Sequence, residues 1–379
     1  MKSVRLGIIG TGSMGSHHAG SVLDGKIRGL KLTAVCDVNV ARFTRAPEVP
    51  RFTDSAAFFD SGLVDAVLVA TPHYSHTTLG IEVLKRGLHL LLEKPISVHK
   101  ADATRLIAAH REKKQVFAAM FNQRTNAHFM KVRDLIQGGH LGEVRRMNWI
   151  VTDWFRSDAY YASGSWRATW EGEGGGVLLN QCPHQLDLLQ WLFGLPVRVR
   201  AHCRFGQHHK IAVEDEVTAY LEFPNGATGV FITTTGEAPG TNRLEIAAEN
   251  GRLILENGKI DFLRNEIPTS KFCRTTKKLF GAPPTWTVSI PSASGGTQWD
   301  GQHAIILQNF ADAILEGKPL LAPASEGIRS VELGNAMLLS TWLNRTIELP
   351  IDGRLFEREL QKRIREERAA KKKVRRPSR

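Results

Sequence analysis

Cysteine is scarce in this sequence, and its spacing argues against a zinc site. The four cysteines of the 379-residue chain are isolated and form no CxxC pair: Cys36, Cys182, Cys203 and Cys273. The histidines show no ligand spacing that improves on chance either. Unpaired cysteines are typical of a reducing compartment. We therefore expect a cytoplasmic protein without a metal site.

Long hydrophobic runs are also missing. No segment approaches the roughly 20 apolar residues that a membrane span requires. The apolar run at residues 4–9 is too short for a signal peptide and ends in glycine. With 42% hydrophobic and 23% charged residues, the composition is that of a globular protein long enough for two domains. These absences predict a protein that is neither exported nor membrane-bound.

Negative charge is in the minority, but the excess of positive charge is local. The chain carries a net charge of +12, and residues 368–379 contribute seven Lys or Arg and no acid. Residues 356–368 have the pattern of a charged helix that leads into this basic tail. We expect a frayed tail that turnover does not require, with contact to RNA or anionic lipid as the alternative. The body of the protein is not predicted to bind nucleic acid.

The first 120 residues alternate short apolar runs with helical patterns, which predicts a parallel, doubly wound sheet. The runs are Val4–Ile9, Leu32–Cys36, Val64–Ala70, Leu88–Leu92 and Val116–Met120. Helices are expected between them, at Thr77–Arg86 and Lys100–Lys113.

From residue 145 onward, apolar residues alternate with polar ones, as in Arg145–Val151 and Val217–Phe223. Three Asn-Gly pairs are typical of tight hairpin turns, so this half predicts an antiparallel meander. Helices are expected at Pro183–Phe193 and His303–Glu316, and a long mobile loop at Pro268–Thr297. We divide the chain into domains at residues 1–122 and 123–355, followed by a charged helix and tail at 356–379.

A glycine-rich motif follows the first predicted strand. In the segment from Gly10 to Gly15, Gly10 allows a tight turn, Gly12 admits a pyrophosphate and Gly15 permits close helix–strand contact. Asp37 ends the next strand, where an acid can bind the adenosine ribose. An acid there repels a 2′-phosphate, so NAD is expected rather than NADP, although Arg42 leaves NADP as the alternative.

Four motifs occur in a characteristic order: the glycine motif, Ala70-Thr71-Pro72, Glu93-Lys94-Pro95, and Gly174-Gly175-Gly176 followed by His184 and Asp187. With them the chain resembles the Gfo/Idh/MocA oxidoreductases, up to about residue 360. The resemblance implies a Rossmann N-terminal domain and an α+β C-terminal domain with a large, mostly antiparallel, open-faced sheet. It also implies that this sheet assembles a homodimer or homotetramer.

The resemblance places two catalytic groups. Lys94 lies beside the nicotinamide and the reacting hydroxyl in this family, and His184 is the expected acid/base. Many relatives carry an Asp one helical turn before the His, whereas this chain has Asn180, which can hydrogen-bond but cannot hold a proton as a carboxylate does. Asp187, one turn later, either orients His184 or is solvated.

Further residues are expected around the cofactor and the substrate. Ordinary loop packing is the alternative for Asn122, Arg124, Tyr160, Trp166 and Arg167, and a core histidine at the helix start is the alternative for His184. The cofactor set adds Thr11, Ser13, Met14, Thr71, Pro72, His73, His76, Glu93 and Lys94 to Gly10, Gly12, Gly15 and Asp37. The substrate set is Asn122, Arg124, Tyr160, Trp166, Arg167, Asn180 and His184.

The leading hypothesis is an NAD-dependent dehydrogenase that oxidises a hydroxyl of a sugar, cyclitol or glycoside. Two alternatives stay open. One is an NAD-dependent glycosidase that oxidises its substrate transiently, eliminates an aglycone and reduces the sugar again. The other is a nucleotide-sensing relative that has lost catalysis, which Asn180 favours and Lys94 and His184 disfavour.

Overall fold

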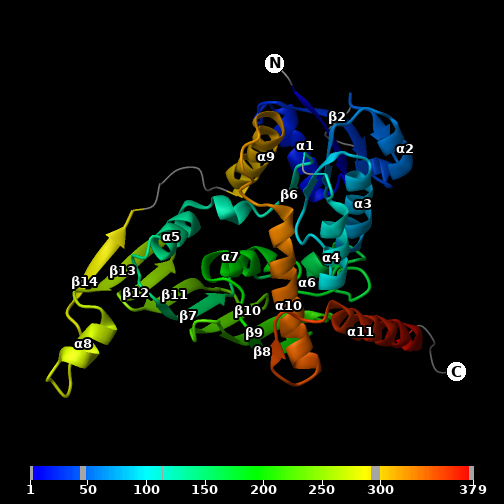
Figure 1. Ribbon diagram of the computed structural model, residues 1–379. Coiled ribbons are helices and arrows are strands. Elements are labelled where there is room, and N and C mark those ends of the chain that lie inside the picture. Colours follow the sequence, from blue (N-terminus) through cyan, green and yellow to red (C-terminus); the bar gives the residue numbers. More distant parts are fainter. Residues whose placement is uncertain (1–2, 43–47, 113, 292–298, 375–379) are drawn as a thin grey trace.

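Six parallel strands form the N-terminal sheet of the computed structural model, which describes residues 3–42, 48–112, 114–291 and 299–374. Their order is β3-β2-β1-β4-β5-β6. This unit is the blue and cyan part of Figure 1. The strands are β1 (Val4–Ile9), β2 (Leu30–Cys36), β3 (Arg51–Phe52), β4 (Ala66–Val69), β5 (His89–Leu92) and β6 (Phe117–Ala119). The helices of this unit are α1 (Ser13–Leu23), α2 (Ser55–Asp60), α3 (His73–Lys85) and α4 (Lys100–Ala109), with the 3-10 turn η1 (Val40–Arg42). The predicted parallel, doubly wound architecture is confirmed.

A nine-stranded sheet forms the second unit, in the order β14-β13-β12-β11-β7-β10-β9-β8-β15. Its strands pair antiparallel except for β7 and β10, which run parallel. The strands are β7 (Val144–Val151), β8 (Arg198–Phe205), β9 (Glu214–Glu222), β10 (Thr228–Thr234), β11 (Asn242–Ala248), β12 (Gly251–Glu256), β13 (Lys259–Asn265), β14 (Thr285–Ile290) and β15 (Ile347–Glu348). The predicted mostly antiparallel sheet is confirmed.

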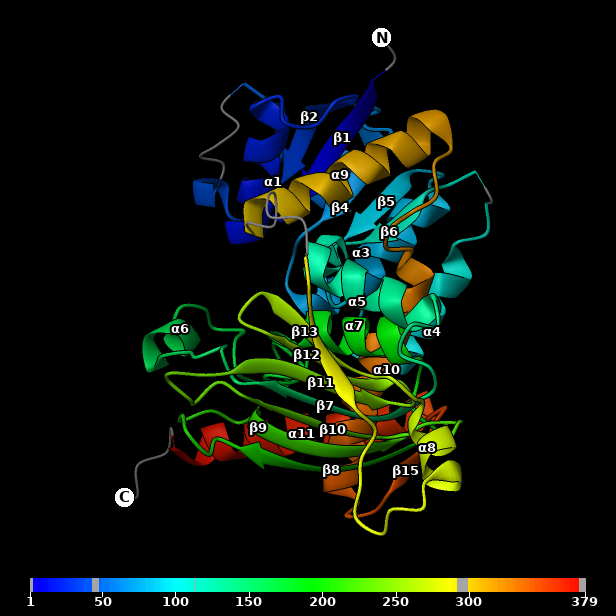
Figure 2. The same ribbon diagram turned by 90° about the vertical axis from the view of Figure 1, so that its left-hand side faces the viewer.

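Helices pack on one face of the nine-stranded sheet (Figure 2). The remaining elements are η2 (Asn122–Thr125), α5 (Ala127–Gln137), α6 (Asp158–Ala162), α7 (Pro183–Phe193), α8 (Thr269–Thr275), α9 (Trp299–Glu316), η3 (Ala324–Glu326), α10 (Gly327–Trp342) and α11 (Gly353–Val374). Alternate residues of β7, such as Met147 and Trp149, are buried under α5 and α7, whereas Asn148 and Ile150 face the other side and are half-buried. The period-two pattern therefore separates a packed face from an open one.

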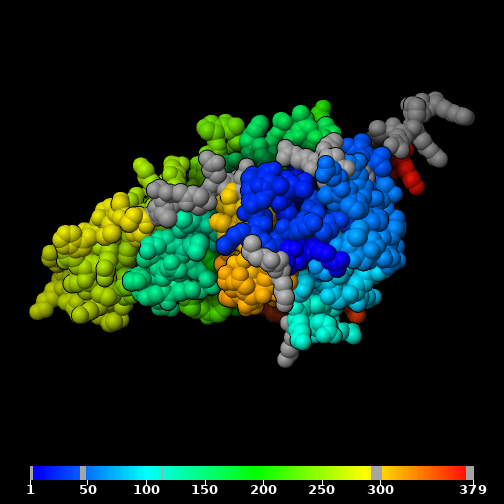
Figure 3. Space-filling view, turned by 90° about the horizontal axis from the view of Figure 1, so that it is seen from above, coloured from blue at the N-terminus to red at the C-terminus, as the bar shows by residue number. Residues whose placement is uncertain are grey.

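Helix α9 returns to the N-terminal unit although it lies far along the chain. Leu307 and Phe310 are fully buried in the core of the parallel sheet. Gln308 accepts a hydrogen bond from the backbone N–H of Arg28, 280 residues away, at 2.8 Å. In Figure 3, α9 (gold) lies against the blue N-terminal residues, while the yellow segment around α8 and β14 lies at the far end of the molecule.

Two expectations are corrected by the structure. The segment predicted as one mobile loop contains α8 and the edge strand β14, which pairs with β13; its residues 292–298 are outside the described part. The charged C-terminal helix, expected to fray near Arg368, runs from Gly353 to Val374 and buries Phe356, Leu360 and Ile364. Within the described ranges, no helix is long and apolar enough to cross a membrane.

Candidate active site

The glycine-rich turn joins β1 to α1, and its glycines differ in whether a Cβ would fit. Gly10 has a φ of 91°, and a Cβ there would meet the Ala70 carbonyl oxygen at 2.6 Å. A Cβ on Gly15 would lie 1.8 Å from the Gly10 carbonyl oxygen. A Cβ on Gly12 would meet only Arg42, at 3.9 Å. Since no side chain caps the start of α1, its first N–H groups are free to bind an anion, and this cradle fits the pyrophosphate of a dinucleotide.

Asp37, at the end of β2, holds the glycine turn. Its Oδ2 accepts hydrogen bonds from the N–H of Thr11, at 2.8 Å, and from the Thr11 hydroxyl, and its Oδ1 accepts from the N–H of Asn39. Nη1 of Arg42 lies 3.8 Å from the same carboxylate. A carboxylate offers about four acceptor positions, so these contacts leave capacity for a ribose hydroxyl.

The other predicted cofactor residues come together because their strands are neighbours. Ser13 and Met14 begin α1 after β1, Thr71 and Pro72 follow β4, and Glu93 follows β5. The order β1-β4-β5 places the carboxyl ends of these strands at one edge, where open parallel sheets bind their ligands.

Glu93 is buried, and each of its carboxylate oxygens has a hydrogen-bond partner. Its Oε1 lies 2.7 Å from Nε2 of His18, and its Oε2 accepts from the N–H of Lys94 at 3.1 Å. Burial opposes ionisation, but the hydrogen bond and charge of His18, with the charges of Lys94 and His303, lower the pKa of Glu93 to about 2. The sequence analysis missed His18; its place in the second turn of the helix after the glycine motif is the only signal for it.

Lys94 reaches across from the parallel sheet to the second unit. Its Nζ donates a hydrogen bond to the backbone oxygen of Asn180 at 2.9 Å. Burial lowers the pKa of Lys94, and the negative charges of Glu93 and Glu173 oppose that change. The ammonium therefore lies where charge developing on a substrate oxygen can be stabilised.

His184 lies in the first turn of α7 and is buried. Its Nδ1 has no hydrogen-bond partner among the described residues, and its ring packs edge-on against Phe121. Burial, followed by the charge of Lys94, places the pKa of His184 well below its usual range. The imidazole is therefore neutral near neutral pH, and one of its ring nitrogens carries a free lone pair.

Glu173 is a second residue that the sequence analysis missed. Its side chain accepts hydrogen bonds from Nδ2 of Asn180 and, at 2.6 Å, from the N–H of Ala168. Its backbone oxygen lies 3.1 Å from Nδ1 of His73. Burial raises the pKa of Glu173 against these donors and the charges of Arg167 and Lys94. Its position directly before the triple glycine was the available signal.

Three predicted substrate residues form one aromatic and cationic group on the loop before the triple glycine. Nη1 of Arg167 donates to the Tyr160 hydroxyl at 2.7 Å, and its guanidinium lies 4.7 Å from the centre of the Trp166 ring. The Trp166 ring packs edge-on against His73, with centroids 5.4 Å apart. Gln181 also donates to the Tyr160 hydroxyl. This group therefore adjoins Asn180 and His73.

Arg124 is not available to a substrate, contrary to the prediction. Its guanidinium is buried and binds both carboxylate oxygens of Asp187 at 2.7 Å, while its Nη1 binds Glu326 at 2.6 Å. Asp187 is fully buried in this pair, so it is neither solvated nor bound to His184. Asn122 is also buried and donates to Gln302.

His76 is likewise committed to structure. Its two ring nitrogens face the backbone oxygens of Pro95, at 2.7 Å, and Thr71, at 2.8 Å. With both nitrogens used, His76 joins the two loops rather than binding the cofactor directly. His73 keeps one nitrogen uncommitted and stays a candidate.

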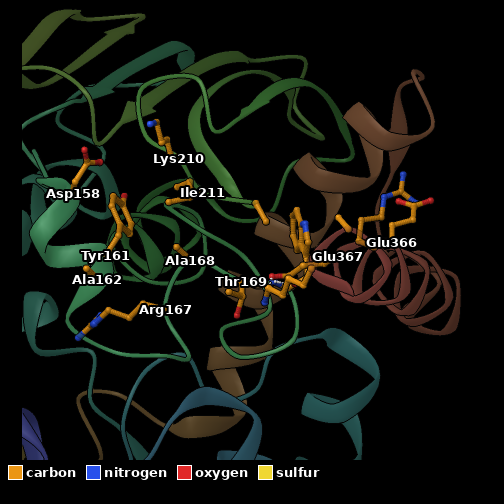
Figure 4. A pocket seen from close by; sticks show the side chains of 15 residues that line it. Asp158, Tyr161, Ala162, Arg167, Ala168, Thr169, Lys210, Ile211, Glu366 and Glu367 are labelled. Atoms are coloured by element: carbon orange, nitrogen blue, oxygen red, sulfur yellow. Dashed lines mark hydrogen bonds and ion pairs between the residues drawn. The ribbon is translucent and has the colours of Figure 1, made fainter. Parts of the chain in front are cut away.

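The C-terminal helix α11 binds the backbone of the segment before the triple glycine. We call this segment the substrate loop, because it carries Tyr160, Trp166 and Arg167 of the predicted substrate set. Oε2 of Glu367, on α11, accepts from the N–H of Trp170 at 2.9 Å and of Glu171 at 3.3 Å. Arg368 pairs with Glu171 at the surface. Figure 4 shows α11 beside a cavity of about 1010 Å³ that the loop lines with Tyr161 and Arg167. Neither Lys94 nor His184 lines this cavity.

The described residues hold no group of three or more His, Cys, Asp or Glu side chains arranged to bind a metal ion. A dinucleotide cradle and a lysine at the carboxyl edge of a parallel sheet, with a buried histidine on α7, are features of an NAD-binding oxidoreductase. The protein is an oxidoreductase with an NAD-binding Rossmann domain.

The chain belongs to the Gfo/Idh/MocA family. Residues 4–121 match the NAD-binding Rossmann domain of this oxidoreductase family, and residues 129–254 match the GFO/IDH/MocA C-terminal domain. The resemblance inferred from the motifs is confirmed.

Curated relatives include inositol dehydrogenases. The chain is 25% identical over 268 residues to myo-inositol 2-dehydrogenase of Thermotoga maritima, covering 67% of this chain and 75% of that protein. It is 24% identical over 361 residues to the NADP⁺-dependent scyllo-inositol 2-dehydrogenase IolW of Bacillus subtilis, covering 92% and 96%. Some other matches are shorter, such as that to MocA of Rhizobium meliloti, which spans 58% of that protein.

Solved structures agree in fold. The WlbA dehydrogenase from Bordetella pertussis, in complex with NADH and UDP-GlcNAcA, has a TM-score of 0.77 at 25% identity, covering 93% of this chain and 100% of that chain. A levoglucosan dehydrogenase in complex with NADH has a TM-score of 0.75 at 19% identity and the same coverage.

Proposed function

We propose that the protein is an NAD-dependent dehydrogenase that oxidises a secondary hydroxyl of a cyclitol, a sugar or a glycoside. One observation carries the proposal: the Lys94 ammonium is held 2.9 Å from the Asn180 backbone oxygen, near the neutral imidazole of His184, whose Nδ1 has no hydrogen-bond partner in the described part of the chain. The curated relatives named as inositol dehydrogenases support this substrate class.

The residues divide the work by their chemistry. The cofactor, when bound, accepts the hydride that leaves the hydroxyl-bearing carbon. Lys94 binds the hydroxyl oxygen and stabilises the charge that develops as the C–H bond breaks, and His184 accepts the hydroxyl proton. Tyr160 and Trp166 present ring faces to the C–H faces of the substrate, and Arg167 binds its polar groups.

The test is an assay of purified protein with NAD⁺ against a panel of inositols, sugars and glycosides. We expect NADH formation with at least one cyclitol or sugar. Release of an aglycone without net NADH, with cofactor retained through desalting, would instead establish the glycosidase reaction. Retention of bound NADH without turnover of any panel member would favour a nucleotide sensor.

We also propose a cytoplasmic homodimer or homotetramer. The open face of the nine-stranded sheet exposes Tyr220 and leaves Ile150, Val230 and Ile232 half-buried, which supports assembly through this face. The four cysteines are free, and three of them are buried, which is consistent with a reducing compartment. Light scattering of the full chain tests the assembly, and a monomer at micromolar concentration would contradict it.

A further inference from the structure

A buried carboxyl lies beside the catalytic lysine, at a position that none of the sequence motifs includes. Glu173 is 2% exposed, and its two oxygens receive two donors, Nδ2 of Asn180 and the N–H of Ala168. Ala168 adopts the left-handed conformation, with a φ of 56°, directly on this contact. Glu173 is thus part of a built arrangement rather than a loosely placed side chain.

This contact fixes the orientation of the Asn180 amide. An ionised carboxylate only accepts hydrogen bonds, so the amide must turn its NH₂ group toward Glu173. Oδ1 of Asn180 then faces the opposite way and makes no hydrogen bond to another described residue. The backbone oxygen of the same residue binds Nζ of Lys94. Asn180 therefore connects the carboxyl of Glu173 to the lysine.

The charges of Glu173 and Lys94 also interact directly. Lys94 is taken out of water, which disfavours its charged form, and Glu173 is one of two carboxylates whose charge favours that form. The other carboxylate, Glu93, already binds His18. Removing the charge of Glu173 would leave Lys94 with less compensation for its burial.

We propose that Glu173 and Asn180 act as one acid–amide pair, in which Glu173 keeps Lys94 protonated and holds the Asn180 amide with its oxygen toward the substrate hydroxyl. Glu173 is a positioning residue in this pair, because it acts through Asn180 and Lys94. The inference rests on the proposed dehydrogenase function for its kinetic consequences, but its effect on Lys94 is independent of any substrate.

The pair also accounts for an amide at position 180. An aspartate at this position would bring two carboxylates into hydrogen-bonding contact in a buried site, where like charges disfavour ionisation of both. In this contact Glu173 supplies the carboxylate and Asn180 supplies the donor. Asn180→Asp should consequently impair the enzyme instead of restoring a better one.

A double-mutant cycle tests the pair: Asn180→Asp, Glu173→Gln, and the swap Glu173→Gln/Asn180→Asp. Asn180→Asp should lower kcat by about 10²-fold, and Glu173→Gln by about tenfold, the range expected for loss of groups that position catalytic residues. The swap restores one carboxylate and one amide, so its kcat should recover to within about tenfold of wild type. Glu171→Gln, two residues away on the surface, is the matched control and should be unchanged.

The second readout is the ionisation of Lys94 itself. Competitive acetylation of the full-length protein across pH, followed by peptide mass spectrometry, reports the fraction of Lys94 that is uncharged. Glu173→Gln should move the Lys94 titration to lower pH, and the swap should move it back. A merely structural role for Glu173 would lower stability without moving this titration.

The outcomes separate the inference from the proposed function. If Asn180→Asp matches wild type in kcat, or if the swap is no better than the product of the single effects, the pair is refuted. An unchanged Lys94 titration in Glu173→Gln also refutes it, even if the variants unfold more easily. If no panel substrate is turned over, the proposed function fails, while the titration of Lys94 still decides the inference.

Discussion

The cofactor side of the site is built mainly from backbone, whereas the substrate side is built from side chains that bind one another. On the cofactor side, Gly10 and Gly15 are required because any Cβ would collide with main-chain atoms. On the substrate side, the contacts are those of Glu173 with Asn180 and of Arg167 with Tyr160. Backbone geometry leaves a glycine spacing that is a known motif. The two side-chain contacts each join residues seven positions apart, and that spacing belongs to no motif that the sequence offers.

Arg124 links the two units of the fold, so removing it should have the largest effect on the free energy of unfolding. It lies on η2, between the units, and binds Asp187 on α7 and Glu326 on η3. Arg124→Leu removes the positive charge that pairs with the buried Asp187 and leaves Gln190 as its remaining side-chain donor, which costs about 3–5 kcal/mol of unfolding free energy. Urea unfolding measures the change, with Arg198→Leu at the surface as control. A change below about 1 kcal/mol would contradict this structural role.

Loss of the catalytic groups should affect turnover and spare the cofactor. We expect Lys94→Ala and His184→Ala each to lower kcat by about 10²-fold or more, because each removes a charge-stabilising or proton-accepting group. Steady-state kinetics and NADH fluorescence titration separate turnover from cofactor affinity. Near wild-type kcat in His184→Ala would assign the proton to Lys94 or to a water molecule.

Two glycines should separate folding from cofactor binding. Gly15→Ala would place a Cβ 1.8 Å from the Gly10 oxygen and should cost about 1–3 kcal/mol of unfolding free energy or more. Gly12→Ala meets open space, so its stability should change by no more than about 0.5 kcal/mol. Its methyl group would occupy the approach of the pyrophosphate, and NADH affinity should fall about tenfold or more. Equal NADH affinity in Gly12→Ala and wild type would show that the pyrophosphate lies elsewhere.

The contact of Glu367 with the substrate loop should contribute more to stability and to activity than the basic residues that follow Glu367. Glu367→Ala leaves the N–H groups of Trp170 and Glu171 without their acceptor, at a cost of about 1–3 kcal/mol, and should raise KM by loosening the substrate loop. Truncation after Glu367 removes surface ion pairs, worth about 0–1 kcal/mol, and should leave turnover unchanged. A folded truncation that loses activity would show that the tail takes part in the reaction.

The smallest expected effect is a change in how Tm depends on pH. Glu214 accepts from the N–H groups of Gly176 and Leu178, and burial raises its pKa to about 7. A folded carboxyl with a raised pKa stabilises the protein fully at acid pH and loses that contribution as pH rises through about 7. Glu214→Gln should therefore lose less Tm than wild type between pH 5 and pH 8, by roughly a few degrees. Identical pH profiles of Tm would contradict this.

The sequence predicted best those elements whose residues carry their own pattern. The buried strands of the parallel sheet and the helix Pro183–Phe193 were found from apolar periodicity and stop signals. Strand β14 was missed although Trp286, Val288 and Ile290 alternate with Thr and Ser, because it is an exposed edge strand within a segment rich in Ser, Thr, Gly and Pro. The packing of α9 on the N-terminal unit was missed because its partner Arg28 lies 280 residues away.

The candidate site divides in the same way. Motifs located Lys94, His184 and the glycine turn, since each stands next to a strand end or a helix start. The role of Arg124 was misassigned because its position along the chain says nothing about Asp187 and Glu326, its partners 63 and 202 residues further on. Glu173 was missed because none of the motifs includes it, although it lies seven residues before Asn180.

The contact between Glu367 and the substrate loop has a consequence for the order in which the protein folds during synthesis. Glu367 lies 197 residues after Trp170, so the loop leaves the ribosome long before the side chain that holds it. At roughly 5–20 residues per second, that interval lasts on the order of ten to forty seconds. Helix α9, which supplies Leu307 and Phe310 to the core of the parallel sheet, also follows the loop and precedes Glu367. A nascent chain should therefore complete the core of its N-terminal unit before Glu367 binds the loop.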